Sequence, residues 1–155
     1  MTAKTGRTVS KWVEVHIDDS GSTLREIAVN SINGLGLSYD ETDLTAWMDA
    51  IKGALPNTPD FHCTIGGPVD TTASTGSHTV LSAVNGGVTP LTFDVRIGIR
   101  QDWEAGEPQF GITASATSGV LVKNYTVDPS NMTYTAEIYM FPGSAAPAWG
   151  TTAES

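Results

Sequence analysis

The chain has 155 residues, the size of one ordinary globular domain, and its 39% hydrophobic content argues against an intrinsically disordered protein. No apolar run is long enough to span a bilayer, so no membrane partner is expected. Lys and Arg number 8 against 17 Asp and Glu, a net charge of −9, which argues against a protein that grips nucleic acid through its phosphates.

The N-terminal part of the chain predicts a loose arm followed by two strands. Residues 1–10 include basic residues with no apolar stretch after them, and we expect a flexible arm rather than a secretion signal. Residues 11–18 alternate between apolar and polar side chains, which is typical of a half-buried strand. The sequence DSGS at 19–22 predicts a turn, and residues 23–29 predict a second strand.

The hydrophobic period changes in the next segment. Residues 34–43 alternate as a strand does, with Ser, Asp and Thr on the polar face. Residues 44–55 instead carry apolar side chains at helical spacing and predict a weak helix of about three turns, which Pro56 ends. The apolar residues of this predicted helix are Trp47, Met48, Ile51 and Leu55.

The middle of the chain predicts a strand, a loop and a short helix. Residues 60–66 alternate again, and residues 66–76 are rich in Gly, Pro, Thr and Ser, as loops are. Residues 77–85 carry an apolar stripe at helical spacing. Ser77 is the expected N-cap of this helix and Gly86 its stop signal.

The last third predicts strands only. Residues 91–101 alternate most regularly, residues 109–116 form a shorter strand, and residues 119–141 predict a hairpin. Alternation with one apolar face predicts antiparallel sheets packed face to face, so the expected fold is a mainly β antiparallel sandwich with one or two short helices. We expect one domain over residues 11–141 and a flexible tail over 142–155.

No group of residues predicts catalytic, cofactor-binding or metal-binding chemistry. The three histidines, His16, His62 and His78, have no metal-ligand spacing to one another or to Cys63, which is expected to be a buried structural thiol. No nucleophile-elbow or phosphate-loop motif occurs. The sequence therefore predicts a protein that is not an enzyme and that uses no cofactor.

Two tryptophans stand apart from the apolar faces. Trp12 shares a strand face with charged residues, and Trp47 lies in the segment 44–55. An exposed aromatic side chain marks an interface or a sugar platform, while packing on the core is the alternative. The sequence leaves both open.

Three motifs in a fixed order carry a resemblance to a known family. They are DDSGSTLREI at 18–27, TDLTAW at 42–47, and TGSHTVLSAV at 75–84, the last followed by the strand LTFDVRIGIR. This order resembles the tail tube (major tail) proteins of long-tailed bacteriophages, over most of the chain from Trp12 to Phe141.

The resemblance implies a structural virion protein of the tail, assembled in the cytoplasm of the bacterial host. Such proteins form hexameric rings that stack into a tube, and each subunit gives strands to an inner β-barrel that spans the ring. The implied partners are copies of the same chain, with tape-measure, tail-terminator and baseplate or tip proteins. Double-stranded DNA passes through the channel without specific binding, which a like-charged lumen favours.

Two sets of residues are expected to serve this assembly. The polar faces of the strands flanking 44–55 are expected to line the lumen: Ser38, Asp40, Thr42, Asp60, His62 and Thr64. The apolar residues of 44–55 are expected to bury themselves against a neighbouring subunit: Trp47, Met48, Ile51 and Leu55.

Other functions remain open at this point. A tail-terminator, a head-decoration protein or a ring protein of a contractile tail or secretion tube would have a similar sandwich. A carbohydrate-binding β-sandwich that uses Trp12 or Trp103 as its platform is a different class of protein.

Overall fold

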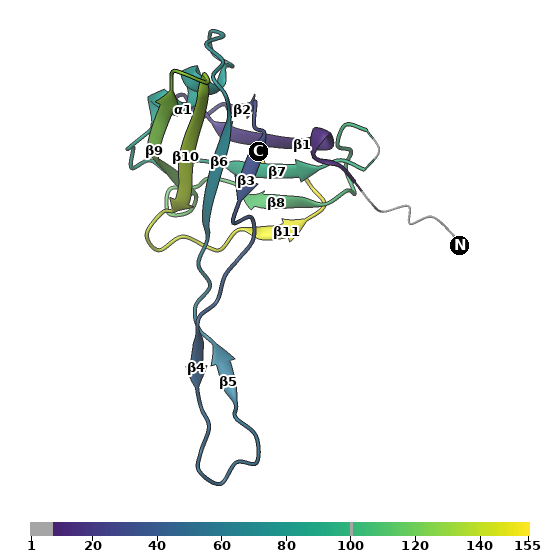
Figure 1. The fold of residues 1–155 in the computed structure, drawn as a ribbon, viewed down its shortest axis with the longest axis vertical. Helices are drawn as coiled ribbons and strands as arrows, with labels where there is room; N and C mark the ends of the chain where they lie inside the picture. The colour runs from purple at the N-terminus through teal and green to yellow at the C-terminus, as the bar shows by residue number, and fades with distance from the viewer. Residues whose placement is uncertain (1–7, 100) are drawn as a thin grey trace, which may run out of the picture.

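Two antiparallel sheets pack face to face, and a long hairpin projects from them (Figure 1). The computed structural model describes residues 8–99 and 101–155. Every pairing between its named strands is antiparallel, which confirms the predicted mainly β sandwich. Over the described residues the strands of one chain do not close into a barrel.

The first sheet has five strands in the order β11-β8-β7-β1-β2. Val15 pairs with Val95 and Ile17 with Phe93, so the apolar faces predicted from alternation meet the core together. A 3-10 turn, η1 (Ser10–Trp12), precedes the sheet. The strands are β1 (Val13–Asp18), β2 (Leu24–Ile27), β7 (Phe93–Ile97), β8 (Gln109–Ile112) and β11 (Ala148–Gly150).

The second sheet has four strands in the order β3-β6-β10-β9. The predicted hairpin over 119–141 is confirmed, since β9 pairs with β10 along most of their length. A bulge between Thr135 and Glu137 shifts the register, opposite Asn124, whose φ is 54°. The strands are β3 (Ser31–Asn33), β6 (His62–Pro68), β9 (Val120–Asp128) and β10 (Thr133–Met140).

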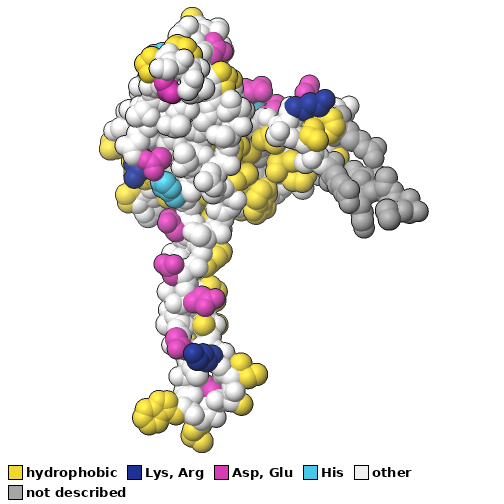
Figure 2. All heavy atoms as spheres, viewed as in Figure 1, with side chains coloured by type: hydrophobic (Ala, Val, Ile, Leu, Met, Phe, Trp, Pro, Cys, Tyr) yellow, Lys and Arg dark blue, Asp and Glu magenta, His cyan; other side chains and the backbone are white. Residues whose placement is uncertain are grey.

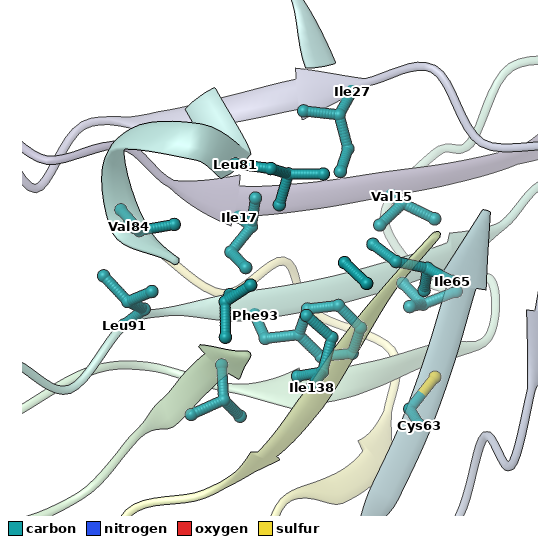
Figure 3. Close-up of a cluster of buried hydrophobic side chains, with 14 of the residues drawn as sticks. Val15, Ile17, Ile27, Cys63, Ile65, Leu81, Val84, Leu91, Phe93 and Ile138 are labelled. Atoms are coloured by element: carbon teal, nitrogen blue, oxygen red, sulfur yellow. The ribbon is translucent and has the colours of Figure 1, made fainter. Parts of the chain in front are cut away.

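The core lies between the sheets and under one helix, α1 (Ser77–Val84) (Figure 3). Leu81 of α1 is fully buried over this core, and the ring of Phe61 lies 5.3 Å from that of Phe110. Cys63 is buried as expected, and this burial raises the pKa of its thiol to about 11. No helix in the described part of the chain is long and apolar enough to cross a membrane.

The helix predicted over residues 44–55 is wrong. The chain forms a two-stranded hairpin there, in which β4 (Glu41–Asp43) pairs with β5 (Ala54–Pro56). An isolated helix of this length is marginal without a packing surface, and no core lies beside this segment. Local polar contacts hold the loop instead: the Asp43 carboxylate accepts the Thr45 N–H at 2.9 Å, and the Thr45 hydroxyl accepts the Gly53 N–H at 2.7 Å.

The expectation of a flexible tail over 142–155 did not anticipate strand β11. Trp149 of this strand packs its ring 4.9 Å from that of Phe110, which gives the segment an apolar anchor. Further along, the Glu154 N–H donates to the Asp94 carboxylate at 3.1 Å. The last residues therefore lie against the outer face of the five-stranded sheet.

Candidate assembly surfaces

The hairpin formed by residues 38–60, here called the arm, extends away from the body of the molecule (Figure 1). Its base is closed by two backbone hydrogen bonds between Ser38 and Asp60, with N···O distances of 2.9 and 2.8 Å. The strands of the arm pair only with each other, and none of its large apolar side chains is buried, so the arm has no hydrophobic core of its own.

Five large apolar side chains between residues 44 and 55 of the arm are exposed, and we call these residues the arm tip. Trp47 is 105% exposed, Met48 98% and Ile51 83%. Figure 2 shows hydrophobic atoms gathered at the end of the arm. Exposed apolar clusters of this kind mark interaction surfaces on monomeric proteins. The arm tip comprises Leu44, Trp47, Met48, Ile51 and Leu55.

The rest of the arm is acidic. Carboxylates follow its length in Figure 2, and Lys52 is its one basic residue. Hydrogen bonds from the Thr45 side chain and backbone lower the pKa of Asp43. The Asp49 carboxylate accepts the Ala46 N–H at 2.8 Å and so shapes the tip. The carboxylates of the arm are those of Asp40, Glu41, Asp43, Asp49 and Asp60.

The six residues expected to line a lumen are divided between the arm and the four-stranded sheet, and Ser38 and His62 line one small pocket where the two meet. Ser38, Asp40, Thr42 and Asp60 belong to the arm, where the Thr42 hydroxyl hydrogen-bonds to Asn57. His62 and Thr64 instead lie on β6 in the four-stranded sheet. Lumen lining therefore remains a prediction for both groups.

The outer face of the four-stranded sheet, which points away from the core, is polar. His62 Nε2 lies 3.1 Å from Glu137 Oε1, and the hydroxyls of Thr126 and Thr135 lie 3.0 Å apart. A hydrogen bond from Asn124 lowers the pKa of Glu137, with smaller contributions from Lys123 and His62. Of the residues on this face, only His62 and Thr64 were predicted to serve the assembly, as lumen residues. The alternation of Thr133, Thr135 and Glu137 with apolar residues is the sequence pattern that indicates the other polar residues of this face.

The outer face of the five-stranded sheet carries a second polar cluster, which the sequence analysis missed. Carboxylate and imidazole atoms of Glu14, His16 and Glu26 lie within 4.8 Å of one another. Burial and, next, the nearby Arg96 lower the pKa of His16. Glu14 also accepts the Trp103 N–H at 3.1 Å, so this cluster fixes the loop over the sheet.

Three of the four tryptophans are engaged within the chain. The indole N–H of Trp103 donates to the Glu107 carbonyl at 3.1 Å, and the Arg96 guanidinium lies 5.3 Å from its ring centre. Trp12 is half-buried, and Trp149 packs on Phe110. Trp47 is the tryptophan whose side chain is wholly available to a partner.

No protein-family model and no curated protein sequence matches the chain. Solved structures do match. A chain in the cryo-EM structure of an extracellular contractile injection system (PVC sheath/tube terminator, extended state) is 14% identical with a TM-score of 0.55, covering 93% of this chain and 96% of that one. A chain of the anti-feeding prophage tube-terminating cap is 10% identical with a TM-score of 0.60, covering 98% and 96%.

A third match comes from the tail of an empty GTA particle, computed with helical refinement and C6 symmetry. It is 18% identical, has a TM-score of 0.54, and covers 95% of this chain and 100% of that one. At these identities the matches show the fold and nothing finer. The fold of this chain is one found in subunits of phage-like tails and contractile injection systems.

Proposed function

We propose that this chain is a structural subunit of a phage-type tail and assembles with copies of itself into rings. The observation that carries the proposal is the arm, which presents five exposed apolar residues from a sandwich whose fold recurs in tail assemblies. An exposed apolar surface of this kind marks a site that a partner covers. The function is one of binding and support, and no catalytic step is part of it.

The end of the tube is the favoured position for these rings. Two of the similar structures are those of a sheath/tube terminator and a tube-terminating cap. The tail tube itself, which the sequence resemblance implied, is the second candidate, favoured by the GTA tail and by a matching chain of a PVC sheath–tube complex. The C6 symmetry of the GTA tail supports six subunits in each ring.

In such a ring, the sheet edges of one copy are completed by the next. The four-stranded sheet ends at β3 on one side and at β9 on the other. The first part of β9 is bridged by Asn85 and Leu91, while its last residues have no bridge on that side among the described residues. Open strand ends of this kind recruit further strands. Pairing between copies would give the inner barrel that the family resemblance implies.

The proposed channel is lined by polar and acidic groups. The lumen candidates are Ser38, Asp40, Thr42, Asp60, His62 and Thr64, and the net charge of −9 repels the phosphates of passing double-stranded DNA. Tape-measure, terminator and baseplate proteins are the further partners of a ring in this place. The site of action is the tail of the particle, after assembly in the cytoplasm of the bacterial host.

Negative-stain microscopy of the purified, concentrated protein tests the proposal. Single rings with a central channel support the terminator position, and long hollow tubes support the tube. Particles with neither form, of single-chain size at every concentration, would contradict a ring-forming function.

A further inference from the structure

An apolar groove opens at the edge of the sandwich where the two sheets diverge. Its volume is about 470 Å³. Val13 and Ile97 form the wall from the five-stranded sheet, and Ile32 and Leu35 form the opposite wall. All four side chains are half-buried. Figure 2 shows hydrophobic side chains gathered on the body in the region where β1 starts.

We infer that this groove receives the arm tip of a neighbouring copy of the same chain. The inference rests on the proposed function, because it requires copies that assemble with one another. It adds to that function the receiving surface and the residues that form it.

Within residues 8–99 and 101–155, the chain carries two apolar surfaces that it does not itself cover, one convex and one concave. The arm tip presents Trp47, Met48 and Ile51 almost completely to water. The groove presents aliphatic side chains from both sheets and has the volume of an ordinary site for a bulky apolar group. A large aromatic side chain set in an apolar pocket is the usual anchor of a protein interface.

The charged groups around the two surfaces also favour this contact. Lys11 and Ser10 form the rim of the groove, and both are exposed. The arm is acidic along its length, with Asp49 at its tip. Lys11 at the rim is opposite in charge to the arm as a whole, which carries five carboxylates and one lysine, Lys52, and this favours the encounter over a random apolar one.

The position of the arm also favours a contact between copies. The arm projects away from its own body, and its exposed apolar tip makes no contact with the core (Figure 1). The arm tip and groove are therefore different patches of one surface, and pairing them makes a head-to-tail contact. Contacts of this type close into rings or continue as helical stacks, depending on the rotation between copies.

A disulfide cross-link between two variants tests the contact directly. Ala50→Cys places a thiol in the exposed loop of the arm, and Ser10→Cys places one on the rim of the groove. Neither substitution removes an apolar contact. The native Cys63 is buried and does not compete. The matched control is Ser130→Cys, in the exposed turn between β9 and β10.

The two variants are mixed, assembled and oxidised. We expect the Ala50→Cys and Ser10→Cys pair to give disulfide-linked dimers in at least tenfold higher yield than the Ala50→Cys and Ser130→Cys pair. Adding Lys11→Glu to the rim variant is expected to lower the yield several-fold, and Lys11→Arg is expected to restore it.

The outcomes separate this inference from the proposed function. Rings or tubes in the microscope with no preferential cross-link would overturn the groove contact and leave the ring function standing. Monomers in the microscope would overturn the ring function. In that case the same cross-link yields, measured at high concentration, would still show whether the groove receives the arm tip. A groove filled by another ligand or segment would appear as equal yields for both pairs.

Discussion

At the scale of single residues, alternation in the sequence located the core well. Val15, Phe93 and Ile138 are each fully or almost fully buried on the faces expected for them. Polar positions were harder to place, because a polar residue is buried only when tertiary contacts satisfy it. Asp94, for example, is fully buried. Its Oδ2 accepts from Arg96 and from the Glu154 N–H, two groups that alternation does not reveal, while its Oδ1 has no partner among the described residues.

Tyr134 provides a test of such a tertiary contact. Its buried hydroxyl donates to the Ala28 carbonyl at 2.6 Å, which joins β10 to the segment before β3. Tyr134→Phe is expected to lower the free energy of unfolding by about 1–3 kcal/mol, because the carbonyl loses a buried donor. Urea unfolding measures the change. Tyr139→Phe, half-buried on the opposite face of β10, is the control, and an equal loss there would contradict the assignment.

His16 predicts a dependence of stability on pH. Because burial and Arg96 lower its pKa in the folded chain, the unfolded chain binds a proton at higher pH than the folded chain does. Stability from this group is present above the ordinary pKa of about 6.5 and is lost as the pH falls below it.

In the His16→Gln variant, the free energy of unfolding should therefore fall less between pH 7.5 and pH 5.5 than it does in the wild type. This window brackets the ordinary histidine pKa of about 6.5. Thermal or urea unfolding at each pH measures the difference. His62→Gln, which removes a more exposed histidine, is the comparison. Equal slopes for wild type and His16→Gln would show that the buried imidazole is not responsible.

Among the elements, the arm differs most from what the sequence predicts. Apolar residues at helical spacing predict a helix only if a core lies beside them, and here the same residues form the tip of a projecting hairpin. The spacing that indicated a helix reflects an interaction surface instead. Strand β11 was missed for a related reason, since it is only three residues long and its partner β8 lies far away in sequence.

The arm tip predicts a separation of stability from assembly. Ile51→Asp with Leu55→Asp changes exposed side chains, so the free energy of unfolding should change by no more than about 0.5 kcal/mol per substitution. Assembly should fail, because the apolar surface that a neighbour covers now carries charge. Size-exclusion chromatography and chemical unfolding measure the two effects.

Val88→Asp is the matched control for the arm tip, since Val88 is 78% exposed in a loop outside the arm. It should assemble as wild type does. Normal rings from the Ile51→Asp and Leu55→Asp variant would show that the arm is not an interface.

At the scale of the whole molecule, the sandwich was predictable and the use of its surfaces was not. Alternating strands and turns define two layers within one chain. Which edge or face meets another copy depends on surfaces brought together only after folding, such as the arm tip and the outer face of the four-stranded sheet.

The charge of the proposed channel predicts an effect on DNA passage. Asp40→Lys with Asp60→Lys should leave ring formation intact and slow DNA release from assembled particles several-fold, because cationic groups would hold the phosphates. Fluorescence of a DNA-binding dye measures the release. Asp102→Lys with Glu104→Lys makes the same charge change in the exposed loop between β7 and β8, outside the arm. This variant should release DNA normally. Unchanged DNA release from the Asp40→Lys and Asp60→Lys variant would show that these two residues do not line the lumen.

In the proposed assembly, copies of this chain complete one another. Sedimentation velocity of the purified protein over a wide concentration range tests this self-association. We predict a discrete, closed oligomer, or stacks of it, whose mass is a fixed multiple of the chain mass of 16.3 kDa. A single species of 16.3 kDa at every concentration would contradict the account.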